Sequence, residues 1–288
     1  MGEPVVLNFD DSIGSLPGYR SIALQDWQER IRYGCSLRDL TALEDALNRE
    51  NFGFPDVAFL GSGDFHHVSF LLIRRMASKR PFQVVVFDNH PDNMRYPWGI
   101  HCGSWIHHLC RLPFVSRVTV IGIASKDIRW NHLLENYLLP LYTGKLRYLC
   151  LSPISRLAHL LGLSSIRDFR HDEDALPQRI AAYLREEDTN PIYLSIDKDV
   201  LSSRAVQTNW DQGTLTARAL IRSIERLKPY VIAADVTGEI SFHAYRKRWK
   251  QLLSKLDGQS AVPPRNLDQI RSRHHQINQK ILRALSSR

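Results

Sequence analysis

The sequence lacks any uninterrupted apolar run of about 18 residues, which is the length that a membrane-spanning helix requires. Its first residues lack the basic and apolar regions of a secretory signal peptide. Cysteine is also scarce, since the 288 residues contain only four, and none of these forms a CxxC pair. These absences lead us to expect a cytoplasmic protein that keeps its thiols reduced and does not insert into a membrane.

Negative charge is scarce at one end of the chain. The net charge of +8 arises after residue 239, where eleven Lys or Arg residues stand against two acids. The rest of the chain carries 27 basic and 28 acidic residues and is therefore close to neutral. A basic segment can bind nucleic acid or an acidic partner, but it is more often a solvated helical face. We favour the solvated face and expect no nucleic-acid partner.

Apolar runs of strand length alternate with helical patterns along most of the chain. This alternation predicts an α/β fold, in which a largely parallel sheet carries helices on both faces. Several runs are apolar at nearly every position, as expected for strands that are buried on both sides. We expect strands at 5–9, 57–61, 83–88, 118–123, 146–151, 192–197 and 230–235. We expect helices starting at 36 and 67, and helices over 175–187, 216–228 and 266–286.

The region after residue 258 differs from the rest. Residues 259–265 contain two adjacent prolines and read as a linker. The helix expected at 266–286 carries apolar residues at roughly helical spacing, so it should pack on the core or on a partner. We therefore divide the chain into a main domain, 1–258, and a basic C-terminal helix, 259–288.

Acidic and histidine side chains cluster directly after three of the expected strands. The clusters are DFHH at 64–67, DNHPD at 88–92 and DKD at 197–199. In an open parallel sheet, ligands bind beyond the carboxyl ends of the strands, so the three clusters should converge. Crowded carboxylates repel one another unless cations hold them, and a metal site resolves this conflict. Carboxylate and imidazole ligands suit Mn²⁺, with Fe²⁺, Co²⁺ or Zn²⁺ as competitors.

The order of these motifs resembles the ureohydrolase family, which includes arginase and agmatinase. Members carry a GGDH-type turn, then DxHxD, then SxDxD, and the similar segments here are 61–66, 88–92 and 195–199. The resemblance covers residues 55–240. It implies a three-layer α/β/α sandwich with a mostly parallel sheet of about eight strands. It also implies two Mn²⁺ per chain, held by His66, Asp88, His90, Asp92, Asp197 and Asp199.

The resemblance extends to residues outside the metal motifs. It implies that His101 shuttles protons and that Glu239 binds the guanidinium group of the substrate. Asp199, or alternatively Asp92, would hold the attacking hydroxide as well as a metal. Asp127 lies in a loop similar to the one that binds the substrate's α-amino group in arginase, and Arg95 points to a charged ligand.

The sequence also departs from the family pattern. Phe65 is an extra residue in the first motif, so His66 and His67 are alternative first ligands, of which we favour His66. We expect Asp64 to cap the following helix or to orient a ligand. The loop at 93–100 is short where arginase binds the amino-acid end of its substrate, which puts arginine itself in doubt.

These observations predict a hydrolase that cleaves a C–N bond of a small cationic guanidino or amidino compound. A hydroxide that bridges the two metals would attack the planar carbon of the substrate. One alternative is a deacetylase-like amidohydrolase with a single zinc ion. Another is a metal-binding protein without activity that contacts a partner through its basic end. Because ureohydrolases often assemble, we also expect a homo-oligomer.

Overall fold

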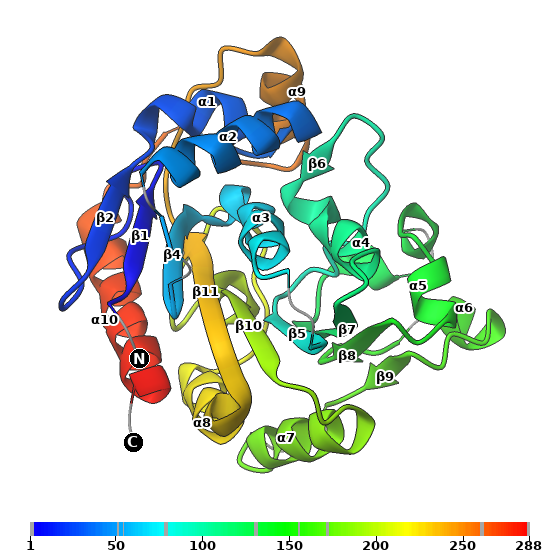
Figure 1. Cartoon of the computed structure of the whole chain (residues 1–288). Helices are drawn as coiled ribbons and strands as arrows, with labels where there is room; N and C mark the ends of the chain where they lie inside the picture. The colour runs from blue at the N-terminus through cyan, green and yellow to red at the C-terminus, as the bar shows by residue number, and fades with distance from the viewer. Residues whose placement is uncertain are drawn as a thin grey trace.

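The computed structural model describes residues 3–50, 52–53, 55–77, 80–129, 132–154, 156–170, 173–259 and 262–286. Within these residues the protein is built on one nine-stranded sheet, in which every neighbouring pair of strands is parallel (Figure 1). The order of strands is β2-β1-β4-β11-β10-β5-β7-β8-β9. The bounds are β1 Val5–Asn8, β2 Arg20–Ala23, β4 Val57–Ser62, β5 Phe82–Phe87, β7 Val115–Ile123, β8 Leu146–Cys150, β9 Ile166–Asp168, β10 Ile192–Asp197 and β11 Val231–Glu239.

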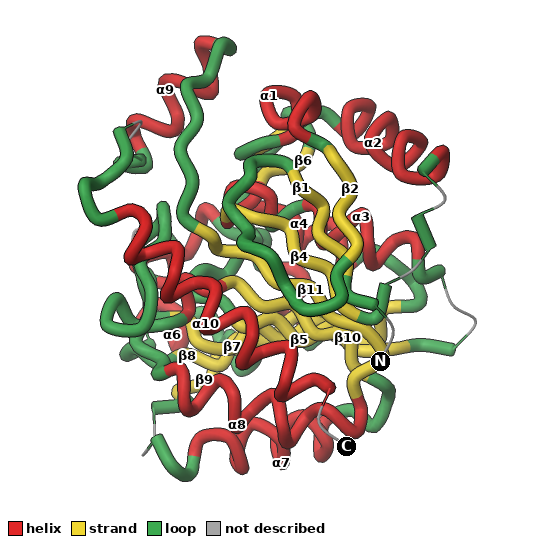
Figure 2. The backbone as a smooth tube through the Cα atoms, turned by 90° about the vertical axis from the view of Figure 1, so that its left-hand side faces the viewer, coloured by secondary structure: helices red, strands yellow, loops and turns green. Residues whose placement is uncertain are grey.

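Helices cover both faces of this sheet and form the outer layers of a three-layer α/β/α sandwich (Figures 1 and 2). One apolar core lies between the sheet and α2 Leu37–Arg49, α3 Val68–Arg75, α4 Trp105–Cys110, α5 Leu139–Tyr142 and α6 Arg156–Leu160. The second core lies between the other face and α7 Leu176–Glu187, α8 Ala217–Leu227 and α10 Leu267–Ser286. The short helix α1 Gln28–Ile31 and the outlying α9 Arg248–Leu256 complete the set of α-helices within the described residues.

All seven strands expected from the sequence are present. Their observed first residues differ from the expected ones by at most three positions, and their last residues by at most four. The two strands that the sequence pattern did not predict, β2 and β9, lie at the edges of the sheet. Three of the four residues of β2 and two of the three residues of β9 are exposed. An edge strand that buries so little produces no apolar run, so periodicity could not reveal it. A two-stranded antiparallel pair, β3 Gly34–Cys35 with β6 Ile100–His101, was also not expected.

The C-terminal helix α10 packs against α8 and β11 (Figure 1). Its buried apolar side chains include Ile277, Ile281 and Leu285, which belong to the second core. Two residues of the expected linker, 260 and 261, lie outside the described residues, and the division of the chain at residue 258 stays a prediction. Among the described helices, none combines the length and the apolar character that crossing a membrane requires.

The topology places the polar clusters at one edge of the sheet. Strand β10 lies next to β5, and β11 separates β10 from β4. Because these strands are parallel, their carboxyl ends and the loops that follow them meet at the same edge. The residues after β4, β5 and β10 are those of the three predicted clusters.

Candidate metal centre

Short turns at the strand ends bring the acidic side chains together. Asp197 is the last residue of β10, and its Oδ1 accepts a hydrogen bond from the backbone N–H of Asp199 at 2.9 Å. Asp88 directly follows β5, and its Oδ1 accepts from the N–H of His90 at 2.7 Å. These side-chain-to-backbone bonds form tight turns.

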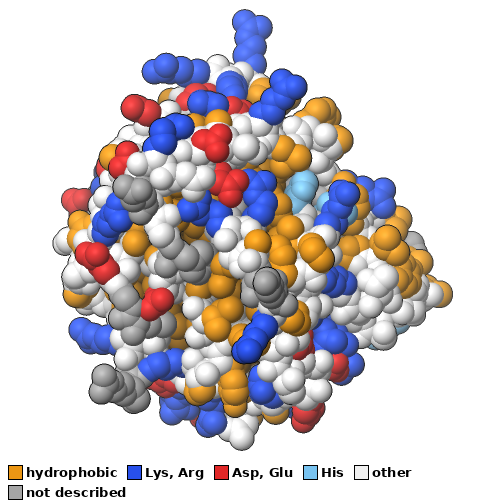
Figure 3. All heavy atoms as spheres, viewed as in Figure 1, with side chains coloured by type: hydrophobic (Ala, Val, Ile, Leu, Met, Phe, Trp, Pro, Cys, Tyr) orange, Lys and Arg blue, Asp and Glu red, His pale blue; other side chains and the backbone are white. Residues whose placement is uncertain are grey.

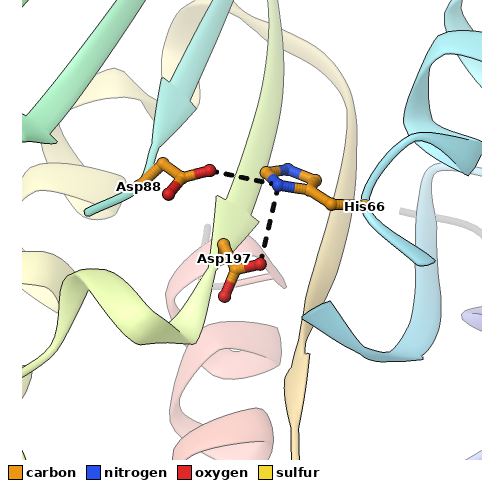
Figure 4. A group of neighbouring side chains, drawn as sticks. All are labelled: His66, Asp88 and Asp197. Atoms are coloured by element: carbon orange, nitrogen blue, oxygen red, sulfur yellow. Dashed lines mark ion pairs between the residues drawn. The ribbon is translucent and has the colours of Figure 1, made fainter. Parts of the chain in front are cut away.

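The first group of metal-binding atoms comes from β4, β5 and β10 (Figure 4). It consists of His66, Asp88 and Asp197, all buried. The Nδ1 atom of His66 lies 3.1 Å from Asp88 Oδ2 and 3.5 Å from Asp197 Oδ2. Asp92 Oδ2 lies 3.0 Å from the same nitrogen. Four potential ligands therefore surround one small volume.

A second group adjoins the first. It consists of Asp88, His90 and Asp199, whose potential ligand atoms lie within 4.8 Å of one another. The Nδ1 atom of His90 lies 2.9 Å from Asp199 Oδ2 and 3.6 Å from Asp88 Oδ1. Asp88 is common to both groups, so the six residues predicted as ligands form one cluster with two adjoining centres.

The alternative first ligand, His67, does not join this cluster. Its side chain is fully buried, and neither ring nitrogen has a hydrogen-bond partner among the described residues. Burial lowers the pKa of His67 well below its ordinary value, and the charges of His101 and Lys250 act in the same direction. A neutral histidine in an apolar setting fits a packing role.

The partners of His66 fix the tautomer that a metal ligand needs. Its Nε2 lies 3.0 Å from Ser195 Oγ, and that hydroxyl donates to Asp235 Oδ1 at 2.7 Å. Asp235 is fully buried and also accepts from Ser69 and Tyr193. Because Ser195 gives its proton to Asp235, the serine oxygen is left to accept from Nε2–H of His66. The lone pair of the neutral ring then lies on Nδ1, which faces the acidic cluster.

His90 has a comparable partner on its outer side. Its Nε2 lies 2.6 Å from Asp211 Oδ1, while Nδ1 faces Asp199. The side chain of Asp211 is 65% exposed, so it stands where the cluster meets solvent. Asn89 joins the same loops, because its Nδ2 donates to Asp211 O and its N–H donates to Asp199 Oδ1. A carboxylate behind a ligating histidine orients the ring and raises its basicity.

Asp92 is held by the chain around it. Its Oδ2 accepts from Trp105 Nε1 at 2.6 Å, and its backbone C=O accepts from the N–H of Ile106. Asp92 has a φ of 46°, in the left-handed region that costs energy for residues other than glycine. The helix α4 thus helps to fix the carboxylate that closes the DxHxD motif.

The cluster concentrates negative charge in a buried place. Asp88, Asp92, Asp197 and Asp199 are each at most 6% exposed. Within the described part of the chain, no Lys or Arg forms an ion pair with any of them, and only histidines do. Buried carboxylates of this kind need cationic partners.

The pKa values of the four carboxyls reflect this crowding. Burial, together with the charge of Asp88, raises the pKa of Asp92 to about 7. Burial also raises the pKa of Asp197 to about 6, and it raises that of Asp199 well above the ordinary range. Burial acts on Asp88 in the same direction, but hydrogen bonds with the two histidines outweigh it and lower its pKa. Without cations, the four groups are not all ionised at neutral pH.

The donor set fits divalent metal ions. Four carboxylates and two imidazoles, without a thiolate, are the hard and borderline ligands that Mn²⁺ and its neighbours accept. The buried Oδ2 of Asp88 lies 3.1 Å from Nδ1 of His66, at the centre of the cluster. This carboxylate oxygen and the ring nitrogen are both donor atoms that a cation could accept.

The structure corrects the role predicted for Glu239. Its carboxylate is buried and pairs with Lys198 Nζ, while Asn278 Nδ2 donates to it at 2.6 Å. His274 Nδ1 lies 3.2 Å from its second oxygen. One oxygen of Glu239 is therefore engaged on the side of α10, where Lys198 supplies the cationic partner that a substrate guanidinium would otherwise be. Among the described residues, Lys198 pairs with Glu239 and forms no ion pair with Asp197 or Asp199.

His101 also differs from expectation. Its ring lies between those of Tyr33 and Tyr96, and its Nδ1 accepts from Gly103 N–H at 2.9 Å. Burial lowers the pKa of His101 to about 4, with a further contribution from Lys250. The ring is neutral at pH 7, whereas the predicted proton shuttle titrates near that pH.

The two remaining predicted substrate residues lie on loops outside the cluster. Asp127 Oδ2 accepts from Ser125 Oγ at 2.9 Å, in a turn that follows β7. Arg95 is exposed, and its guanidinium lies 6.0 Å from the ring of Tyr137. Their contact with a substrate stays a prediction.

Asp64 is the hub of a network that sequence reasoning did not foresee. Its Oδ2 accepts from Arg32 Nε at 2.7 Å, and its Oδ1 accepts from Trp210 Nε1 and Gln259 Nε2. It thus joins the loop after β4 to the loop after β10 and to the end of α9. The preceding residue, Gly63, lies against Asp197 and Trp210.

The sequence pattern does not identify the residues that orient His66 and His90, although it contains hints of some of them. Ser195 is the serine of the SxDxD motif, and Asp235 begins the element that ends at Glu239. Asp211 follows Trp210 in a polar loop shortly before Gly213. An acid in the loop after a metal motif indicates a residue that could orient a metal ligand. Whether its carboxylate reaches the ring of such a ligand depends on the conformation of the loop.

A glycine on β11 leaves room for Asp197 and for the turn that follows β10. Gly238 has a φ of 87°, and a Cβ atom there would lie 2.4 Å from Asp197 Oδ1 and 2.6 Å from Lys198 N. A Cβ atom essentially never lies this close to an atom to which it is not bonded. The backbone of β11 can therefore approach the end of β10 only because this residue has no side chain.

Comparisons with known proteins agree with this architecture. No protein-family model matches the sequence. A protein of Thermotoga maritima described as uncharacterized is 29% identical over 212 residues, which cover 73% of this chain and 68% of that protein. The agmatine ureohydrolase of Thermoplasma volcanium superposes with a TM-score of 0.56 at 12% identity, covering 98% of this chain and 89% of that chain.

A second solved structure gives the same result. The proclavaminate amidino hydrolase of Streptomyces clavuligerus superposes with a TM-score of 0.54 at 16% identity, covering 99% of this chain and 92% of that chain. The fold is therefore arginase-like, as the sequence motifs predicted. The structural neighbours belong to the arginase, agmatinase and ureohydrolase group, at low sequence identity.

Proposed function

We propose that the protein is a divergent ureohydrolase, a hydrolase that cleaves a C–N bond of a small guanidino or amidino compound with two Mn²⁺ ions per chain. One observation carries the proposal. Asp88 belongs to both donor groups, so a pair of cations would share it as a ligand. Two cations bound in this way lower the pKa of a water molecule toward neutrality and supply a nucleophile at pH 7.

The residues divide between the two centres. His66, Asp92 and Asp197 would hold one cation, His90 and Asp199 would hold the other, and Asp88 would contribute to both. Asp199 would also accept a hydrogen bond from the attacking water and so orient it. Fe²⁺, Co²⁺ and Zn²⁺ are competitors for the same ligands.

The charge of the site supports a cationic substrate. Two divalent cations would balance the four buried carboxylates, so the exposed Asp211 is the acid that attracts a positively charged group toward this edge of the sheet. Asp127 and Arg95, on loops that follow β7 and β5, are the proposed contacts for the rest of the substrate. Since Glu239 is engaged with Lys198, we assign no substrate contact to it.

Proton transfer to the leaving amine is assigned to His101. Its pKa of about 4 means that the ring carries a proton only transiently, which suits a relay better than a store of protons. The neighbouring ring of Tyr33 restricts the orientation of the imidazole. A His101→Ala variant that keeps full turnover would remove this residue from the mechanism.

Metal analysis and activity together test the proposal. The purified protein should retain about two equivalents of metal after incubation with Mn²⁺ and dialysis, as a binuclear centre requires. A panel of guanidino and amidino compounds is then assayed for release of urea, ammonia or an amine. Activity that disappears in His90→Asn supports the proposal, whereas a two-metal protein inactive on the whole panel contradicts the assignment of substrate.

The same experiments bear on the two alternatives. A deacetylase-like enzyme with one zinc ion needs only one group of metal-binding side chains. The second group, around His90, would have no function in such an enzyme. A chain that binds one zinc ion and releases acetate would favour that alternative. A chain that binds metal and catalyses no reaction would favour a non-catalytic protein. Assembly into a homo-oligomer and a cytoplasmic location stay predictions.

A further inference from the structure

The helix α9 turns most of its apolar side chains away from the protein, and Leu253 alone among them is half-buried. Its buried residues are Lys250 and Ser254, both polar. Trp249, Leu252 and Leu256 are 38%, 61% and 73% exposed. These three follow a spacing of three and four residues, which places them along one face of the helix. A surface helix of a globular protein normally has the opposite orientation, so this face is built to contact something else.

Basic side chains flank the apolar face. Arg246, Lys247 and Arg248 precede or open the helix, Lys255 lies in its last turn, and all four are exposed. Lys and Arg side chains also project from the end of the molecule at which Figure 1 places α9 (Figure 3). Apolar residues with a tryptophan on one face and clustered cations beside them are the pattern of helices that lie in a membrane interface.

Three acids lie near α9. Asp39 acts on Lys247, whose charge helps to lower the pKa of Asp39, but Asp39 forms its ion pair with Arg30. The carboxylate of Glu29 accepts hydrogen bonds from His243 and from the backbone N–H groups of Arg246 and Lys247, so it holds the start of the segment in place. Asp257, directly after the helix, accepts from the hydroxyl of Tyr33. The side chains of the cations remain directed outward.

The helix is fixed to the protein before any partner binds. Lys250 Nζ donates to the backbone carbonyls of Glu29 and Arg32 at 2.9 and 2.7 Å, at the C-terminal end of α1. The carbonyl of Glu29 is among those that a helix end leaves without partners, so the ammonium group satisfies it. The anchor turns the polar side of α9 inward and presents the apolar side. In Figure 2, α9 stands apart from the sheet at the margin of the molecule.

We infer that α9 docks the protein on the surface of an anionic lipid bilayer. The leucines and Trp249 enter the boundary of the acyl chains, and the four cations contact acidic headgroups. A second copy of the chain is a poor occupant, because a symmetric contact would bring two sets of these cations together. A convex helix at the margin of the molecule also suits a flat, deformable surface. This inference is independent of the metal centre and of the proposed reaction.

Vesicle flotation with the full-length, metal-loaded protein tests the inference. The protein should float with vesicles of phosphatidylcholine and phosphatidylglycerol, and it should remain unbound with pure phosphatidylcholine. Binding should weaken as salt is added, because salt screens the charges. Leu252→Ser with Leu256→Ser should reduce binding about tenfold or more, since each leucine loses its apolar contact. Arg246→Gln with Arg248→Gln should reduce it about fivefold per cation.

Matched variants on other helices test whether the loss of vesicle binding is specific to α9 or follows from any loss of exposed leucines or cations. Leu139→Ser with Leu160→Ser changes two leucines that are 73% and 77% exposed on α5 and α6. Arg271→Gln with Arg273→Gln removes two exposed cations from α10. Both control variants should bind vesicles like the parent chain. Thermal melts of all variants verify that the fold is intact.

Three results would overturn the inference. The first is a parent protein that does not float with anionic vesicles at low salt. The second is binding that the α9 variants and the control variants reduce equally. The third is a parent oligomer, seen by light scattering, that dissociates in Leu252→Ser with Leu256→Ser, because a second copy would then cover this face.

Discussion

His90 lies between two carboxylates, and its Nε2 is 2.6 Å from Oδ1 of Asp211. The opposite nitrogen of the ring faces the acidic cluster, so in the proposed metal centre Asp211 would set both the tautomer and the orientation of His90. This places a positioning residue at the solvent edge of the site, where it can be changed without disturbing the core.

Asp211→Asn should weaken binding of Mn²⁺ about 10- to 100-fold, because the ring loses the charged acceptor that orients it. Titration calorimetry with the metal-free protein measures this affinity directly. Asp174→Asn is the matched control, since Asp174 is 61% exposed and lies among arginines away from the cluster. Equal affinities of Asp211→Asn and the parent chain would remove Asp211 from the centre.

Metal stoichiometry should distinguish the shared ligand from the others. Asp88→Asn removes a ligand of both groups, so both equivalents of metal should be lost on dialysis. His90→Asn affects one group and should leave about one equivalent, in the centre around His66. Elemental analysis of the dialysed variants gives the two values. Retention of about two equivalents by Asp88→Asn would show that Asp88 does not bridge the centres.

In the metal-free protein, the stability contributed by Asp92 and Asp197 should fall as the pH rises from about 4 to about 7. Buried histidines such as His101, whose pKa is lowered to about 4, act in the opposite direction, so the effect is measured as a difference between the parent chain and Asp92→Asn with Asp197→Asn. The pKa of Asp92 is raised to about 7 and that of Asp197 to about 6, above the ordinary carboxyl value of about 4. A carboxyl with a raised pKa in the folded state stabilises the fold below its unfolded pKa, and this stabilisation is lost as the pH passes the folded pKa.

Melting temperatures in the presence of a chelator, measured across this pH range, test the sign. Mn²⁺ should reverse the loss above pH 7, because it binds the ionised carboxylates and displaces protons. In Asp92→Asn with Asp197→Asn the fall should be smaller than in the parent chain. A difference in melting temperature between the parent chain and this variant that stays constant from pH 4 to pH 7 without metal would contradict the expectation.

Lys198→Met should destabilise the fold by about 3–5 kcal/mol, because it leaves the carboxylate of Glu239 buried without its cationic partner. The double variant Lys198→Met with Glu239→Gln should recover much of this loss. Urea denaturation at neutral pH gives the three free energies of unfolding. If Glu239→Gln alone leaves stability unchanged and abolishes substrate binding, Glu239 is a substrate residue after all.

The sequence predicted the parts of the structure that depend on local pattern. Seven strands appeared as apolar runs, and the six candidate ligands appeared as acids and histidines after three of them. Their convergence followed from the rule that parallel strands end at one edge. The helix after Ser36 was also visible, because the serine side chain accepts from the N–H of Asp39 as an N-cap.

Other features depended on contacts between distant residues. Whether Glu239 faces a substrate or Lys198 depends on how β11 bends near Gly238, which no local pattern encodes. The low pKa of His101 follows from burial between two tyrosine rings on different loops. The link between Asp211 and His90 spans 121 positions of the chain and depends on loop conformation. These relationships are tertiary, so they appear only once the chain is folded.

Because Gly238 has no side chain, this position limits which residues other proteins with the same arrangement of strands could carry there. Replacing its hydrogen with a methyl group would drive Asp197 and the start of the following turn outward, and the ligand set would no longer close around a common centre. The spacing between two neighbouring strands is thus adjusted at the scale of a single carbon atom. A chain with a larger residue here must build its rim from a different turn, so this one position limits which sequences can share the arrangement.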